Sequence, residues 1–385
     1  MVPIPGVTLA GMLLPAESID PARTPNEALV VGECGPAERE EQARLFNACF
    51  RKRVTAADLA WRYDRGPHGP ALSLVSRPPG GEGISGYACS PRRVRAYGAS
   101  ATEARIGETG DVMTHPAWRK RGIFSELDRR AMQRTSELGW AGVFGLPNRH
   151  SAGIFLELGW QQVGTLRPWS FLFRGDGAAR SERAKSGRLA GLRAPLDAFR
   201  SARALRRLER AAAGGLSPRS LERFPSEVEA LSARVESRYP FMVHRNAPYL
   251  DWRFLDSPAR LHRPFGLFSK NGLEAYVVIQ LPREPGGMGF VVDLLAGDPG
   301  SLAAAMALGL RELERAGAAL AQATAVDGSD WSLQLAGAGF LPPHPRHALI
   351  VIFYPHDPSH PVAQAARNAS RWYLTDGDRD DETMG

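Results

Sequence analysis

The stretch HPAWRKRGIFSEL, residues 115–127, places three cations against a glycine at the expected start of a helix. These residues are Arg119, Lys120, Arg121 and Gly122. The N–H groups in the first turn of a helix have no intrahelical partner, and the positive end of the helix dipole lies behind them. Phosphate is the usual ligand of such a turn, and the missing Cβ of Gly122 lets a pyrophosphate approach the backbone. A solvated basic turn is the alternative.

Sequence patterns on both sides of this turn predict an alternating α/β unit. Residues 105–115, RIGETGDVMTH, read as a strand whose internal glycines indicate a bulge or a close backbone approach. Apolar spacing predicts a helix over 123–139 that ends at Gly139, and a buried strand and a short helix follow. Upstream, a helix with Leu45, Phe46, Cys49 and Phe50 turned inward precedes three alternating strands.

Two similar sets of landmarks indicate a duplicated fold. Trp61-Arg62-Tyr63 is followed by Pro67, and Trp252-Arg253-Phe254 is followed by Pro258 at the same offset. A small-Gly-aromatic step then ends a helix-like run in each half, at Gly159 and at Gly339. We therefore predict two copies of one fold in the chain.

The predicted boundaries follow the breaks in composition. We expect a first domain over 28–173, a basic helical linker over 174–219, a second domain over 220–355 and a C-terminal tail over 356–385. Within the linker, Leu196, Phe199, Leu205 and Leu208 have near-helical spacing between arginines, which predicts an amphipathic basic helix. The tail, rich in acids, is expected to fray after Trp372 and Tyr373 dock.

Composition excludes several classes of protein. The chain has 385 residues, 43% hydrophobic and 23% charged, which is a balance typical of globular domains. No apolar run suits a membrane span and no secretory leader is evident, so a cytoplasmic location is expected. The three cysteines have no metal or disulfide spacing, and no metal site is expected. The net charge of +7 comes with no nucleic-acid module, and no nucleic-acid partner is expected.

The order of these elements resembles the GNAT superfamily of acetyl-CoA-dependent N-acetyltransferases. The matching segments are VMTHPAWRKRGIFSEL, residues 112–127, for the pyrophosphate turn, and PNRHSAGIFLELGW, residues 147–160, for the Asn-led helix. The tandem layout looks like bacterial two-domain members of that superfamily. The resemblance implies an α/β (α+β) fold with a mixed central sheet flanked by helices, in two tandem copies. The second copy is degenerate, since AGDPGSL at 296–302 lacks the cationic turn and its Asp298 repels phosphate.

The resemblance also assigns the residues that bind acetyl-CoA. A splayed strand would hold the pantetheine arm and the thioester through its backbone, the turn would wrap the pyrophosphate, and an asparagine would touch the far part of the arm. The strand residues are Val112, Met113 and Thr114; the turn residues are Arg119, Lys120, Arg121, Gly122, Ile123, Phe124 and Ser125; the asparagine is Asn148.

The catalytic groups are less clearly marked. Phe155 stands where many family members carry a tyrosine that protonates the departing thiolate, which phenylalanine cannot do. Glu108 and Asp111 flank Gly110 on the splayed strand and are the candidate general bases, with plain strand-end carboxylates as the alternative. His115 and His150 are weaker candidates.

The resemblance implies an N-acyltransferase that moves an acetyl group directly from acetyl-CoA to a primary amine of a small molecule or amino sugar. The identity of the acceptor and the oligomeric state are left open. The alternative from a different class is a non-catalytic acetyl-CoA sensor or an interaction protein that uses the basic helix.

Overall fold

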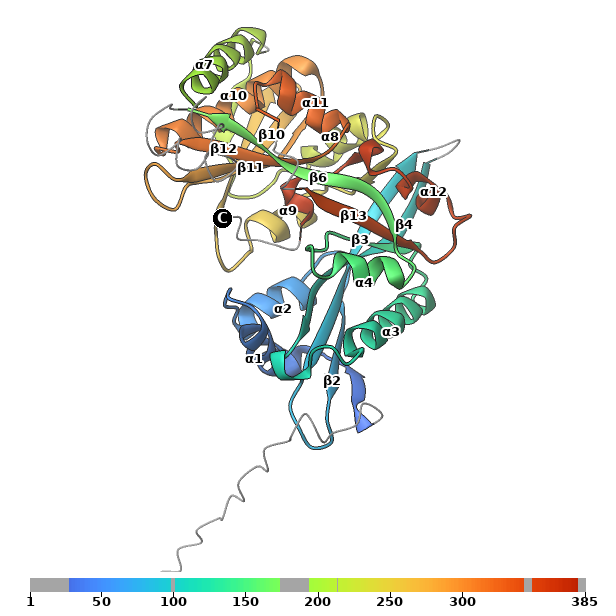
Figure 1. Cartoon of the computed structure of the whole chain (residues 1–385). Coiled ribbons are helices and arrows are strands. Elements are labelled where there is room, and N and C mark those ends of the chain that lie inside the picture. Colours follow the sequence, from blue (N-terminus) through green and yellow to red (C-terminus); the bar gives the residue numbers. More distant parts are fainter. Residues whose placement is uncertain (1–27, 98–100, 174–193, 213, 343–347, 380–385) are drawn as a thin grey trace, which may run out of the picture.

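In the computed structural model, the described residues are 28–97, 101–173, 194–212, 214–342 and 348–379. Their strands form one mixed sheet in which both halves of the chain take part (Figure 1). The strand order along the main path is β1-β2-β3-β4-β5-β13-β6-β12-β11-β10-β9-β7, while β14 pairs with β8 and β8 with β3.

The first half follows the predicted alternation of helices and strands. Its elements are β1 (Val30–Glu33), a 3-10 turn (Pro36–Glu38), α1 (Arg39–Cys49), α2 (Ala56–Asp64), β2 (Leu72–Arg77), β3 (Ser85–Tyr97), β4 (Ala101–Thr114), a 3-10 turn (Pro116–Trp118), α3 (Ile123–Glu137), β5 (Gly142–Gly145), α4 (Ala152–Glu157) and β6 (Gln161–Leu172). Two of the predicted strands are one continuous strand, β3.

Helices cover both faces of this part of the sheet. Ala88 of β3 packs in a cluster with α1 and α2, while its neighbours Tyr87 and Cys89 pack in another with α3 and α4. This alternation follows from the two-residue period of a strand. Of the side chains predicted to turn inward from α1, Phe50 is instead 36% exposed, because it follows the last helical residue.

The second half repeats this alternation. Its elements are α7 (Ala194–Ala211), β7 (Ser217–Ser220), α8 (Glu227–Glu236), β8 (Phe241–Val243), α9 (Ala247–Phe254), β9 (His262–Ser269), β10 (Gly272–Gln280), β11 (Met288–Ala296), α10 (Pro299–Arg315), β12 (Leu320–Val326), α11 (Asp330–Gly337), β13 (Leu349–Pro355), α12 (Pro361–Ala366), a 3-10 turn (Ala369–Arg371), β14 (Trp372–Tyr373) and a 3-10 turn (Asp376–Asp378).

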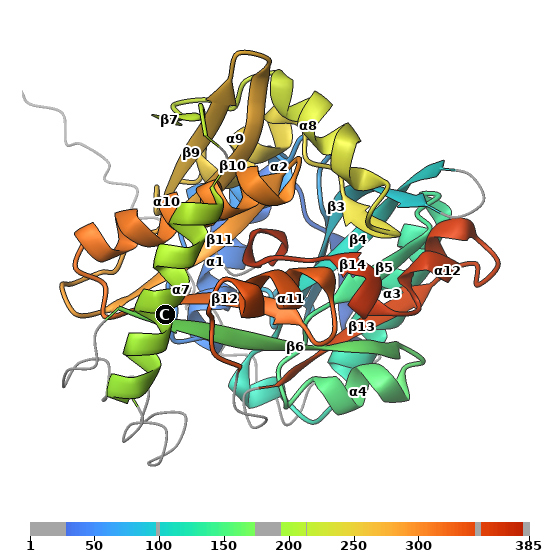
Figure 2. The same cartoon turned by 90° about the horizontal axis from the view of Figure 1, so that it is seen from above.

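The halves are joined by an exchange of strands, visible in Figures 1 and 2. Strand β6 leaves the first half and pairs with β12 of the second, with Leu172 opposite Leu320. Strand β13 comes from the second half and lies between β5 and β6, with Phe353 opposite Phe144. The domain boundaries remain a prediction. Backbone hydrogen bonds join the two halves on both sides of β13, because this strand pairs with β5 and with β6.

The predicted basic helix is present as α7, and its orientation differs in part from the expectation. Leu205 and Leu208 are buried, but Leu196 and Phe199 are 52% and 60% exposed. The inward positions nearer its start are occupied by small and polar residues, including Ser201, whose hydroxyl accepts the N–H of Leu172 at 3.3 Å. Residues 174–193 of the predicted linker lie outside the described residues.

The C-terminal segment does not fray where it was expected to. After Trp372 and Tyr373, residues 374–378 are buried, and the side chain of Arg379 is only 21% exposed. Buried hydrogen bonds explain the difference: the Arg245 guanidinium donates to Asp378 at 2.7 Å, and the Thr375 hydroxyl donates to Asp293 at 2.8 Å. Residues 380–385 lie outside the described residues.

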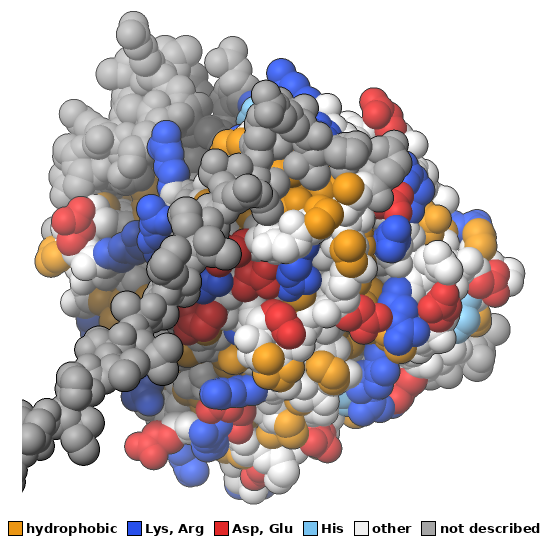
Figure 3. All heavy atoms as spheres, turned by 90° about the horizontal axis from the view of Figure 1, so that it is seen from below, with side chains coloured by type: hydrophobic (Ala, Val, Ile, Leu, Met, Phe, Trp, Pro, Cys, Tyr) orange, Lys and Arg blue, Asp and Glu red, His pale blue; other side chains and the backbone are white. Residues whose placement is uncertain are grey.

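Basic and acidic side chains are mixed on the surface of the face that Figure 3 shows. Among the described residues, no helix has the length and apolar character that a membrane crossing requires.

Candidate active site

The strands β4 and β5 separate from each other, and this separation creates the candidate site. The two strands pair in parallel over three residues only, with Gly107–Thr109 of β4 opposite Val143–Gly145 of β5. Strand β4 then continues to Thr114, whereas β5 ends at Gly145. A cavity of about 430 Å³ opens between residues 109–112 of β4 and residues 146–148 after β5. Parallel strands that diverge in this way expose backbone N–H and C=O groups to a ligand.

A bulge in β4 shapes the edge of this cavity. On β3, Gly86 pairs with Met113 and Ala88 with Gly110, so Asp111 and Val112 together oppose one residue of β3. Asp111 has a φ of +48°, a strained backbone conformation for a residue other than glycine. The bulge that the glycines of this strand predicted is therefore present, and both bulged residues line the cavity.

The cationic turn stands at the start of α3, as predicted. Gly122 is the N-cap with a φ of +73°, and no side chain caps the helix there. A Cβ built on Gly122 meets no atom within 4 Å, so the glycine faces open space. Lys120 also has a positive φ, +62°, which tightens the turn. The Arg119 side chain donates to the carbonyl of Thr114 at 3.1 Å, and Arg121 lies over the Trp118 ring.

The remaining predicted cofactor residues have different surroundings. Ile123 and Met113 are buried in the core, so only their backbone can contact a ligand. The Phe124 ring packs against Phe155, with ring centroids 5.1 Å apart, and Ser125 is half-buried. Asn148 lines the cavity, and its side-chain oxygen accepts the N–H of His150 at 2.9 Å, which orders the start of α4.

Phe155 forms part of the cavity wall where a proton donor was considered. It is 2% exposed and packs edge-on against Trp160, with centroids 5.0 Å apart. The Trp160 indole and the Tyr87 hydroxyl both donate to the buried carboxylate of Asp128, at 3.2 and 2.8 Å. The hydroxyl of Tyr87, whose ring stacks with Phe124, is therefore engaged with Asp128 rather than with the cavity.

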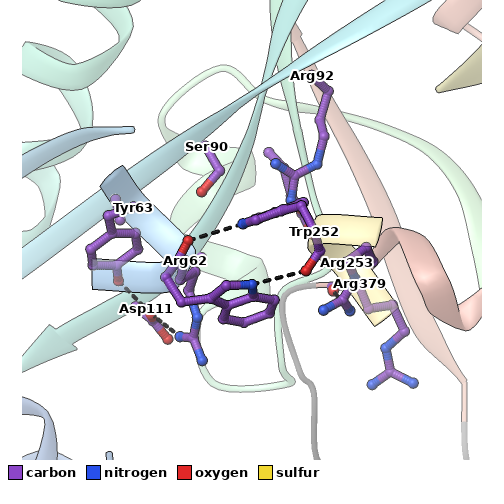
Figure 4. A pocket seen from close by; sticks show the side chains of 12 residues that line it. Arg62, Tyr63, Ser90, Arg92, Asp111, Trp252, Arg253 and Arg379 are labelled. Carbon is purple, nitrogen blue, oxygen red and sulfur yellow. Dashed lines mark hydrogen bonds and ion pairs between the residues drawn. The ribbon is translucent and has the colours of Figure 1, made fainter. Parts of the chain in front are cut away.

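The two candidate bases lie in different places. Glu108 is 3% exposed, is ion-paired with Arg92 and lines a small adjoining hollow. Asp111 lines both that hollow and the main cavity. Its carboxylate accepts hydrogen bonds from Arg62 and from the Tyr63 hydroxyl, both of the first W-R-aromatic copy (Figure 4). Burial raises the pKa of Tyr63 well above its usual range, so its phenol stays protonated and donates.

Sequence reasoning missed several residues of the site. Arg62 and Tyr63 belong to the motif that revealed the duplication, and that repetition was a usable signal for their importance. Arg379 lines the cavity although the C-terminal tail was expected to fray. No local pattern links Arg379 to β4, since the two meet only through the fold of the second half.

Charge in the main cavity is mostly positive. Its charged lining residues are Arg51, Lys52, Arg62, Asp111 and Arg379. The first two follow α1, and Arg62 is on α2. Among the described residues, no group of three His, Cys, Asp or Glu side chains has the arrangement of a metal site.

The second half lacks an equivalent of the open turn. The N-cap of α10 is Asp298, whose carboxylate accepts the N–H groups of Gly300 and Ser301 at 2.8 and 3.0 Å. The first-turn donors of α10 are thus used by the protein itself, and the carboxylate adds negative charge there. This geometry supports the predicted degeneracy of the second copy.

Comparison with known proteins agrees with this geometry. Residues 33–163 match the acetyltransferase (GNAT) domain family. No curated protein matches the chain in sequence. A probable N-acyltransferase of unknown function from Enterococcus faecalis is similar in structure over 84% of this chain and 71% of that chain, with a TM-score of 0.56 and 13% identity.

Two further solved structures have the same fold over most of their length. N-myristoyltransferase from Saccharomyces cerevisiae, solved with myristoyl-CoA, matches over 88% of this chain and 83% of its own, with a TM-score of 0.53 and 11% identity. A tandem GNAT protein from the clavulanic acid biosynthesis pathway matches over 86% of this chain and 100% of its own, with a TM-score of 0.50 and 12% identity. The resemblance to the GNAT superfamily is thereby confirmed: residues 33–163 match a GNAT domain, and the chain has the fold of a tandem GNAT protein. GNAT proteins use acetyl-CoA or another acyl-CoA.

Proposed function

We propose that the protein is an acetyl-CoA-dependent N-acetyltransferase that acts on a primary amine of a small molecule or amino sugar. The observation that carries this proposal is that the first half contains three features together: the uncapped α3 N-terminus at Gly122, the separation of β4 from β5, and a cavity at that separation.

The cofactor site is built from the backbone of the turn and of β4. The first-turn N–H groups of α3, with Arg119, Lys120 and Arg121, bind the pyrophosphate of CoA. The residues that would hold the pantetheine arm between the diverging strands are Val112 and Asn148. Bound acetyl-CoA supplies the acetyl thioester. The backbone donors of β4 stabilise negative charge that develops on its carbonyl oxygen.

Asp111 is the group best placed to accept the proton that the amine of the acceptor must lose. Its carboxylate is held by Arg62 and Tyr63 at the edge of the cavity. A carboxylate has about four lone-pair sites, so it can accept a hydrogen bond from the ammonium of the substrate in addition to the two hydrogen bonds that it already accepts. Glu108 lines the hollow that adjoins Asp111 and can act only through a relay.

The acetyl group passes directly to the amine. A covalent route would need a thiolate, but burial raises the pKa of Cys34, Cys49 and Cys89 above the usual value. The attacking nitrogen forms the amide bond, the carbon–sulfur bond breaks, and CoA leaves as a thiolate because Phe155 has no proton to give. A thiol with a pKa of about 8.5 is an adequate leaving group near neutral pH.

The test is product formation with acetyl-CoA and a panel of primary amines, followed by mass spectrometry of both the amine and the intact protein. An acetylated amine with an unmodified protein is the expected result. Acetylated protein after incubation with acetyl-CoA alone, with turnover lost in a cysteine variant, would refute direct transfer.

A non-catalytic acetyl-CoA sensor is the second candidate, and the phenylalanine at position 155 favours it. It predicts binding of acetyl-CoA with no product from any amine of the panel.

A further inference from the structure

The C-terminal segment, residues 372–379, occupies the position in the second half that the pantetheine arm has in the proposed function of the first. Strands β11 and β12 are parallel and pair only at residues 288–290 and 320–322, as β4 and β5 pair over three residues. Beyond that point they separate in the same way.

The segment contacts both of these separated strands. Its Asp376 carboxylate accepts the N–H of Thr324 on β12 at 2.6 Å, and its Thr375 hydroxyl donates to Asp293 on β11 at 2.8 Å. The Tyr373 hydroxyl donates to the carbonyl of Leu294 on β11. The second half therefore uses the chain itself to fill the gap between its strands.

This anchoring fixes the backbone of Arg379. The Arg253 guanidinium donates to the carbonyl of Gly377 at 2.7 Å and to that of Arg379 at 2.5 Å. Arg253 belongs to the second W-R-aromatic copy, and Arg62 of the first copy holds Asp111. The two motif arginines thus position opposite charges, an acid through Arg62 and a cation through Arg253, and both charged residues line the same small hollow (Figure 4).

The side chain of Arg379 reaches the cavity of the first half. It lines the main cavity, the small hollow beside Asp111, and a neighbouring cavity of about 340 Å³ that also contains Arg149. Its guanidinium is ion-paired with Asp376 at 3.1 Å, and a guanidinium has five donors, so it can bridge that carboxylate and a ligand.

We propose that Arg379 is a specificity residue that binds an anionic group of the acceptor, so the site selects amines that also carry a carboxylate or a phosphate. The proposal rests on the proposed acetyltransferase function. In the main cavity Arg51, Lys52, Arg62 and Arg379 stand against one acid, Asp111. This arrangement suits an acceptor with two ends: its ammonium lies at Asp111 and its anion at the cations.

Matched pairs of acceptors test the proposal. β-Alanine is compared with propylamine, and O-phosphoethanolamine with ethanolamine, in the wild type and in Arg379→Ala. The wild type is expected to prefer the anionic member of a pair, through kcat/KM, by about 10- to 100-fold, as hydrogen bonds to charged groups give. The pair with the larger preference identifies the anion as carboxylate or phosphate.

The variants separate a specificity role from a structural one. Arg379→Ala should remove the preference through the acceptor KM and leave the KM of acetyl-CoA unchanged, while Arg379→Lys should keep part of it. Arg371→Ala is the matched control, because this exposed arginine directly before the segment does not line the cavity. A preference that survives in Arg379→Ala, a preference for the neutral amines, or a changed KM for acetyl-CoA alone would overturn the proposal.

A binding measurement keeps this test distinct from that of the proposed function. With CoA present, β-alanine or O-phosphoethanolamine should raise the melting temperature of the wild type but not of Arg379→Ala. That result without turnover would reject the acetyltransferase and keep the anion site. Turnover of amines without any selective binding would do the reverse.

Discussion

Trp61 and Trp252 exchange hydrogen bonds across the junction of the two halves. The Trp61 indole donates to the carbonyl of Trp252 at 2.9 Å, and the Trp252 indole donates to the carbonyl of Trp61 at 3.0 Å. Their rings stack with centroids 5.3 Å apart. The two W-R-aromatic copies thus meet each other through equivalent contacts, as expected for two repeats related by an approximate two-fold axis.

This reciprocity predicts similar losses from equivalent substitutions. Trp61→Phe and Trp252→Phe each remove one indole donor and leave a buried carbonyl unpaired, so each should lower the free energy of unfolding by about 2 kcal/mol, measured by denaturant unfolding. Trp140→Phe is the control, because Trp140 is 5% exposed and its buried indole nitrogen has no hydrogen-bond partner among the described residues. Equal losses in all three variants would mean that the exchanged bonds contribute little.

Calorimetry tests where the cofactor binds. One acetyl-CoA should bind per chain, because Asp298 caps α10 and residues 372–379 fill the gap between β11 and β12. Gly122→Glu should abolish binding, because it places bulk and negative charge at the turn. It should also abolish the stabilisation of the folded protein by acetyl-CoA, which is expected to be about 2.7 kcal/mol at a ligand concentration of 100 times Kd.

The control for this variant is Gly139→Glu, at the other end of α3. Gly139 has a φ of +72° and faces open space, as Gly122 does, so the substitution Gly139→Glu imposes the same backbone strain at a place away from the turn. A stoichiometry near two, or unchanged binding in Gly122→Glu, would show that the site has been assigned to the wrong place.

The sequence predicted the parts of the fold that local patterns determine. The turn at residues 119–122, the bulge in β4 and the end of α3 just before Gly139 each depend on residues close in the chain. Backbone preferences and the two-residue period of a strand act over such distances.

Long-range pairing was not predictable in the same way. The exchange of β6 and β13 depends on pairing with strands of the other half, β12 and β5. The burial of residues 374–378 depends on partners such as Arg245 and Asp293, which lie more than 80 residues before them in the chain. The acidic residues of the tail suggested that it is exposed to solvent, but Asp378 is ion-paired with Arg245 and Asp376 accepts the N–H of a residue in β12. One sequence contains no signal of this pairing.

Two buried histidines predict how stability depends on pH. Burial lowers the pKa of both His68 and His262 to about 3, from 6.5. Below pH 6.5 the unfolded chain takes up protons that the folded protein does not, so their contribution is complete above pH 6.5 and is lost as pH falls toward 3.

Each histidine should add about 1.4 kcal/mol per pH unit to this loss. His68→Gln should therefore reduce the slope of unfolding free energy against pH between 6 and 4 by about that amount, while exposed His150→Gln should not. An identical slope in wild type and His68→Gln would exclude this histidine as a source of the acid sensitivity.

The proton that leaves the amine should govern the pH dependence of catalysis. Asp111→Asn should lower the rate near neutral pH by about 100-fold, and less as pH approaches the amine pKa of about 10.4, where the amine is already neutral. Glu108→Gln should have a smaller effect in the same direction. Asp64→Asn is the control, since it breaks another arginine pair of α2, with Arg39, away from the cavity.

The leaving thiolate adds a second expectation to the same pH profile. Without an acid at Phe155, the wild-type rate should not fall steeply above pH 8.5, and Phe155→Tyr should change it little or raise it modestly. A steep fall above pH 8.5 would instead indicate a general acid elsewhere in the site.

The most direct test of acetyl transfer in the first-half cavity is product formation in three proteins: wild type, Gly122→Glu and Gly139→Glu. Each is incubated with acetyl-CoA and the best amine of the panel, and the acetylated amine is measured by mass spectrometry. Product from the wild type and from Gly139→Glu, with none from Gly122→Glu, is the predicted result. Equal product from all three would contradict the assignment of the site, and no product from any of them would contradict the enzyme.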